Sequence, residues 1–102
     1  MARYEKLVRD RIPEILDTKG VPYEQRVASD IEYRAELIKK LVEEAREFSE
    51  AGSVEELADV LEVVAALRTL PEYVGVETIQ DEKRTERGGF TERLIVSGDD
   101  GK

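Results

Sequence analysis

The chain of 102 residues has room for one small domain, which excludes an enzyme built from separate cofactor and substrate lobes. It contains no cysteine and no histidine, which excludes disulfides, thiolate or imidazole metal ligands and Ser-His-Asp triads. The net charge of -8 argues against general nucleic-acid binding, because neutralising phosphates requires an excess of lysine and arginine. No apolar run approaches the ~18 residues that span a bilayer, and no secretory signal is evident, so we expect a cytoplasmic protein that does not enter membranes.

The first predicted element is a short helix over residues 12–19. Pro13 stands at a favoured first-turn position and Gly20 at a favoured helix end. Residues 21–28 then form a connector that includes Pro22. We expect this helix to flank the main helical unit.

Two helices in close succession form the centre of the predicted fold. SDIE at 29–32 and SVEE at 53–56 both match the capping pattern S-x-x-E, which opens helices. The first helix is expected over about 30–51, with Gly52 at its end, and the second over about 54–70. So short a connection predicts an antiparallel helix hairpin.

The C-terminal part is more polar. Residues 77–87 are expected to form a polar helix that ends at Gly88-Gly89, and residues 94–96 a short extended piece. Residues 97–102 read as a polar tail, expected to be disordered because it has nothing to bury. The single predicted domain therefore covers residues 1–96 and is all-α.

Four carboxylates lie at unusual positions on the predicted hairpin. Glu44 and Glu47 border the apolar stripe of the first helix, and Glu56 and Asp59 project among valines and alanines of the second. Burying an unpaired carboxylate is costly, so such groups usually face a cation or a donor. The antiparallel hairpin brings the two pairs opposite each other, and an all-oxygen donor set suits Mg²⁺ or Mn²⁺.

A simpler interpretation stays open at this point. The four acids can be ordinary surface groups of amphipathic helices, solvated by water and neighboured by Lys39, Lys40 and Arg46. Two such pairs on one hairpin, one of them on a helix that is apolar around most of its circumference, favour the metal site.

Longer stretches of the chain resemble a known family. EEAREF at 43–48 followed by EELADVLEVV at 55–64 resembles the E-x-x-E and E-x-x-D signature of the all-α nucleoside triphosphate pyrophosphohydrolases, the MazG-like superfamily. YEKLVRDRIPEIL at 4–16 and EKRTERGGF at 82–90 are similar to a small single-domain branch of phosphoribosyl-ATP pyrophosphohydrolase-like, or house-cleaning, NTP pyrophosphatases. The resemblance implies a MazG-like helical bundle built on the antiparallel hairpin.

The resemblance also implies an activity. It assigns Glu44, Glu47, Glu56 and Asp59 as ligands of Mg²⁺, with Mn²⁺ as a substitute, in hydrolysis of a nucleoside triphosphate between the α- and β-phosphates. The products are a nucleoside monophosphate and pyrophosphate, and a house-cleaning role on non-canonical nucleotides is one implied use. Glu43 is a candidate auxiliary group that orients or deprotonates the attacking water.

A triphosphate also requires cationic partners. Lys6, Arg9, Lys83 and Arg87 are candidates. For Arg9, Lys83 and Arg87 the resemblance favours phosphate contact over a merely solvated basic face. Because the helix within residues 57–70 is apolar around most of its circumference, we expect a homodimer or homotetramer that buries it between subunits.

Two other classes of function remain. A non-catalytic interaction module would use the acidic hairpin to bind a basic partner, but it needs its acids outside, unlike Glu56 and Asp59. A divalent-cation-binding protein without hydrolysis would share the carboxylates but would have no need of Lys83 or Arg87.

Overall fold

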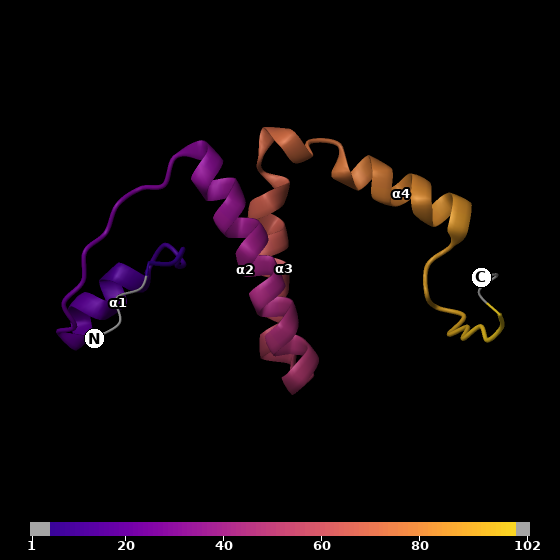
Figure 1. Ribbon diagram of the computed structural model, residues 1–102, viewed down its shortest axis with the longest axis horizontal. Coiled ribbons are helices and arrows are strands. Elements are labelled where there is room, and N and C mark those ends of the chain that lie inside the picture. The colour runs from indigo at the N-terminus through magenta and orange to yellow at the C-terminus, as the bar shows by residue number, and fades with distance from the viewer. Residues whose placement is uncertain (1–4, 100–102) are drawn as a thin grey trace.

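The computed structural model describes residues 5–99, and that part of the chain is helical with no strand (Figure 1). Its elements in chain order are α1 (Ile12–Lys19), α2 (Asp30–Ala51), α3 (Val54–Arg68), the short 3₁₀ helix η1 (Pro71–Tyr73) and α4 (Val76–Arg87). The all-α prediction is confirmed. Over the described range, none of these helices combines the length and the apolar character needed to cross a membrane.

The hairpin of α2 and α3 forms as its capping residues predict. The Ser29 hydroxyl accepts a hydrogen bond from the Glu32 amide at 3.2 Å, and the Ser53 hydroxyl accepts one from the Glu56 amide at 3.2 Å. Gly52 ends α2 with φ of 62°, a left-handed conformation that glycine adopts at little cost. The two helices run antiparallel and pack along their lengths (Figure 1).

The second helix of the hairpin ends two residues earlier than expected. It stops at Arg68, and Thr69 and Leu70 turn back to bond the carbonyls of Ala66 and Leu67. Leu70 is extended, with φ of -78° and ψ of 140°, because the ring of Pro71 disfavours a helical residue before it.

The flanking segments agree with the expected helices. α1 has the predicted bounds, and α4 begins one residue early, after Gly75 with its φ of 89°. Residues 94–96 belong to no helix or strand of the described range, and the short extended piece expected there stays a prediction. Residues 100–102 of the expected polar tail lie outside the described range.

The chain is far more extended than a compact domain of its length. Its radius of gyration is 18.4 Å, against about 13 Å for a compact chain of about 100 residues. Within residues 5–99 only Leu37, Val63 and Glu44 are buried, and all three lie on the hairpin. The N- and C-terminal helices stand away from it (Figure 1). The hairpin is therefore the part of the molecule that positions side chains against each other.

Candidate metal centre

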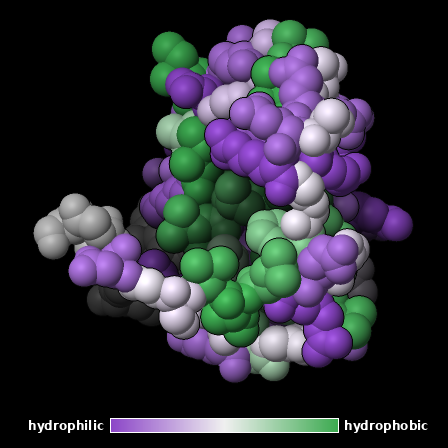
Figure 2. Space-filling view, turned by 90° about the vertical axis from the view of Figure 1, so that its right-hand side faces the viewer, coloured by the Kyte–Doolittle hydropathy of each residue, from purple (hydrophilic) through white to green (hydrophobic). Residues whose placement is uncertain are grey.

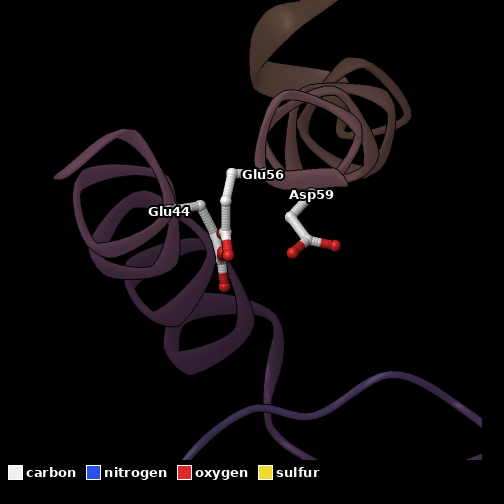
Figure 3. A group of neighbouring side chains, drawn as sticks. All are labelled: Glu44, Glu56 and Asp59. Carbon is white, nitrogen blue, oxygen red and sulfur yellow. The ribbon is translucent and has the colours of Figure 1, made fainter. Parts of the chain in front are cut away.

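Three of the four predicted ligands meet between the hairpin helices (Figure 3). Glu44 comes from α2, and Glu56 and Asp59 come from the first turns of α3. One carboxylate oxygen of each lies within 4.8 Å of the others. The tight Gly52-Ser53 connection produces this approach, because it brings the start of α3 beside the last turns of α2. We call these three residues the acidic cluster.

The acidic cluster contains carboxylate oxygens that have lost water without gaining a donor. Glu44 is only 8% exposed, and its Oε2 atom is buried without a hydrogen-bond partner, as is Oε2 of Glu56. The Lys40 ammonium lies 3.7 Å from the other oxygen of Glu44, Oε1. Because unsatisfied buried polar atoms are rare in folded proteins, these two oxygens are available to a bound cation.

The electrostatics of the acidic cluster agree with that reading. Burial raises the pKa of Glu44, and the nearby charge of Glu47 raises it further. Burial also raises the pKa of Glu56, with added repulsion from Glu47 and Asp59. A divalent cation would remove this repulsion, and carboxylate oxygens are the ligands that Mg²⁺ and Mn²⁺ prefer. The residues present therefore fit the predicted metal.

Glu47 stands at the edge of this arrangement. It is exposed and is not one of the three residues whose oxygens converge, although its charge acts on both Glu44 and Glu56. Its position one turn along α2 from Glu44 leaves it within reach of an ion held by the acidic cluster. Its role as a ligand stays a prediction.

Two basic residues of the N-terminal segment reach the hairpin. An Arg9 guanidinium nitrogen donates to Oδ1 of Asp59 at 2.7 Å, and the Lys6 ammonium donates to Oε1 of Glu43 at 3.1 Å. The bond from Lys6 lowers the pKa of Glu43. Arg9 is thus placed beside the acidic cluster, whereas Glu43 is engaged by Lys6 and does not join the acidic cluster.

A shallow groove lies between the N-terminal segment and α2. It is lined by Glu5, Lys6, Leu7, Glu36, Lys39, Lys40 and Glu43. From the sequence, Lys39 and Lys40 are expected only as neighbours of surface acids, and their place in a groove is not predicted. Their spacing does indicate where they lie on the helix. Each lysine precedes one glutamate of the pair at 43–44 by four residues, which puts it beside that glutamate.

The remaining predicted phosphate contacts lie elsewhere in a single chain. Lys83 and Arg87 belong to α4, which projects away from the hairpin (Figure 1). Within one copy they are not brought to the acidic cluster, so any contact they make with a substrate there requires a second copy or a movement of α4.

Comparisons with family models, curated proteins and solved structures found no match for this chain.

Proposed function

We propose that this protein is a Mg²⁺-dependent hydrolase that cleaves nucleoside triphosphates between the α- and β-phosphates, releasing a nucleoside monophosphate and pyrophosphate. The observation that carries the proposal is the acidic cluster, in which Glu44, Glu56 and Asp59 converge while two buried oxygens have no donor. The chain also lacks the cysteine and histidine on which many other hydrolytic sites depend.

Glu44, Glu56 and Asp59 would hold the cation, with Glu47 available at the rim. A bound Mg²⁺ supplies charge that neutralises phosphate oxygens and lowers the pKa of a coordinated water. The chain's own part is to hold three carboxylates at fixed positions on two packed helices, which limits the rearrangement needed on binding.

The basic residues beside the acidic cluster would bind the phosphates. Lys6, Lys39 and Lys40 line one groove, and Arg9 lies at Asp59. In this proposal the main role of Glu43 is to hold Lys6 in position. The action of Glu43 on the attacking water is a lesser role. We further propose that the protein acts as a homodimer or homotetramer, which offers Lys83 and Arg87 a route to a neighbouring copy's site.

The test is product analysis with Mg²⁺ and a panel of standard and damaged nucleoside triphosphates. Purified protein is compared with Glu56→Gln, which removes one ligand charge, and with Glu50→Gln, which removes an exposed charge of α2 outside the acidic cluster. We expect monophosphate and pyrophosphate from the native protein and from Glu50→Gln but not from Glu56→Gln. Mn²⁺ binding without turnover of any nucleotide would instead favour a cation-binding protein, and neither binding nor turnover would favour an interaction module.

A further inference from the structure

The groove between the N-terminal segment and α2 starts beside the acidic cluster and runs along the helix. It has a volume of about 410 Å³. Lys40 lines it, and the Lys40 ammonium lies 3.7 Å from Oε1 of Glu44. The lining is mainly charged, in contrast to the face of the molecule in Figure 2, where apolar side chains gather. A polar ligand held at the acidic cluster can therefore extend into this groove.

Two charged side chains of the groove are available to a ligand. The other charged residues of the lining form ion pairs within the chain; they are Glu5, Lys6, Lys40 and Glu43. In the described part of the chain, the side chains of Glu36 and Lys39 form neither a hydrogen bond nor an ion pair. They stand three residues apart on α2, so they are neighbours on the helix surface. Glu36 is half-buried, which limits its contact with water.

Glu36 and Lys39 place a hydrogen-bond acceptor beside a donor. An ionised carboxylate only accepts hydrogen bonds, and an ammonium group only donates them. The Watson–Crick edge of guanine has the complementary pattern, because a carbonyl oxygen lies next to two N–H donors. The carboxylate can accept from both donors while the ammonium donates to the carbonyl oxygen. Adenine and cytosine offer one amino group on that edge, and uracil would turn a carbonyl oxygen toward the carboxylate.

The spacing along α2 suits a single nucleotide. Glu36 precedes Glu44 by eight residues, or about 12 Å at about 1.5 Å per residue. In an extended nucleotide the base edge lies at a comparable distance from the α-phosphate. Lys40 stands midway between the two glutamates, where the sugar and phosphates would run. Leu7 is half-buried in the opposite wall of the groove and offers an apolar contact to the base.

We infer that Glu36 and Lys39 bind the base of the substrate and make the protein selective for guanine nucleoside triphosphates. The inference rests on the proposed function, because the triphosphate must be held at the acidic cluster for its base to reach Glu36. It leaves Lys6 and Lys40 as the phosphate-binding lysines of the groove and assigns Lys39 to the base. Neither Glu36 nor Lys39 touches the reacting atoms, so both determine specificity and not the chemical step.

The experiment measures binding separately from turnover. Calorimetric titration with Mg²⁺ uses triphosphate analogues in which a methylene group joins the α- and β-phosphorus atoms, so that this linkage is not hydrolysed. The analogues carry guanine, hypoxanthine, adenine or uracil. Hypoxanthine differs from guanine only in lacking the 2-amino group, which removes one N–H donor to Glu36. We expect the native protein to bind the guanine analogue about tenfold more tightly than the hypoxanthine analogue, and the uracil analogue most weakly.

Two variants separate the contacts to the base. Glu36→Gln has one carbonyl oxygen and cannot accept both N–H bonds, so the tenfold difference between guanine and hypoxanthine should disappear. Lys39→Gln should weaken both of these analogues to the same extent, because both bases keep the carbonyl oxygen. Glu50→Gln removes an exposed charge of α2 outside the groove and should bind every analogue as the native protein does. Far-UV circular dichroism reports whether each variant keeps its helices.

Equal affinity of the native protein for the guanine and hypoxanthine analogues would overturn the inference, as would a difference that persists in Glu36→Gln. Rates with the natural triphosphates of the same four bases test the proposed function separately. Hydrolysis of all four with equal efficiency would keep the hydrolase and overturn base selection by Glu36. Selective binding that depends on Glu36, without hydrolysis, would keep the base site and overturn the hydrolase. If no analogue binds, both are wrong.

Discussion

The two sides of the α2–α3 hairpin differ in how they are completed. The acidic side, which carries Glu43 and Asp59, has partners from the same chain, because Arg9 pairs with Asp59 and Lys6 pairs with Glu43. The apolar side, which carries Ile31, Ile38, Val42, Leu57 and Leu61, is not covered by the described part of the chain, and these side chains are exposed. One hairpin thus carries a group of charges that its own chain partly neutralises and a set of apolar side chains that the described part of its own chain leaves exposed.

This difference separates binding chemistry from stability. Charges on the acidic side cost stability unless a cation joins them, whereas the apolar side gains stability by losing water. Changes on the acidic side should therefore alter cation binding and turnover while the proposed oligomer persists. Changes on the apolar side should weaken the proposed oligomer while cation binding persists. The following predictions test that separation, starting with the largest effect.

Replacing one ligand of the acidic cluster should abolish turnover. We expect Asp59→Asn to lower nucleotide hydrolysis by about 100-fold or more, because a neutral amide is a weaker ligand for a divalent cation than a carboxylate. Initial rates with Mg²⁺ and calorimetric titration with Mn²⁺ measure the effect. Glu62→Gln, an exposed neighbour on α3, is the control and should behave as the native protein. Unchanged Mn²⁺ affinity in Asp59→Asn would contradict the assignment.

Removing the buried charge should stabilise the protein that has no cation bound. Glu44 is only 8% exposed, and its Oε2 atom has no hydrogen-bond partner. Glu44→Gln therefore removes the cost of keeping a carboxylate charge away from water. We expect the melting temperature without metal to rise by about 4–8 °C, the shift that about 1 kcal/mol causes in a domain of this size. Saturating Mg²⁺ should stabilise the native protein but not the variant. Thermal melts with and without Mg²⁺, at equal protein concentration and with Glu50→Gln as control, measure both effects.

Stability should depend on pH in a direction set by the same carboxyls. The pKa values of Glu44 and Glu56 are raised in the folded state, so the stability they contribute is present below their unfolded pKa and is lost as pH rises through the folded pKa. Without metal, the melting temperature should rise as pH falls from neutral toward the ordinary glutamate pKa of about 4.3. Lowered pKa values at Glu43 and Glu32 act in the opposite sense only at more acidic pH.

Saturating Mg²⁺ should reverse the slope, because the cation binds the ionised carboxylates and its affinity falls as they are protonated. Glu44→Gln serves as the reference and should show a weaker dependence on pH in the absence of metal. An identical pH dependence in the variant and the native protein would show that other groups dominate the titration.

Much of the hairpin was predictable because its signals are local. Ser29 and Ser53 cap the helices, and Gly52 forces the reversal, so the helix order and the meeting of Glu44 with Glu56 follow from neighbouring residues. The hydrogen bond from Arg9 to Asp59 joins residues 50 positions apart. The spacing of residues within one helix does not predict such a contact. The departure of α4 from the hairpin likewise depends on the conformation around Gly75, which composition does not determine.

The smallest effect concerns Arg9, which shares Asp59 with any bound cation. The side chains of this ion pair are partly exposed, at 55% for Arg9 and 40% for Asp59. Breaking the pair therefore changes the free energy of unfolding only slightly. We expect Arg9→Gln to raise Mn²⁺ affinity in the absence of nucleotide by about two- to fivefold, because the cation no longer competes with the guanidinium. Nucleotide hydrolysis should fall at the same time, since a phosphate contact is lost.

Arg11→Gln is the matched control, because Arg11 pairs with Glu14 within the same segment and lies outside the acidic cluster. Its Mn²⁺ affinity should equal that of the native protein at the same ionic strength. High salt should narrow the difference between native protein and Arg9→Gln, because it screens an exposed pair. If Arg9→Gln binds Mn²⁺ more weakly than the native protein, the guanidinium supports the cation site instead of competing with it. The N-terminal segment would then hold Asp59 in position for the cation.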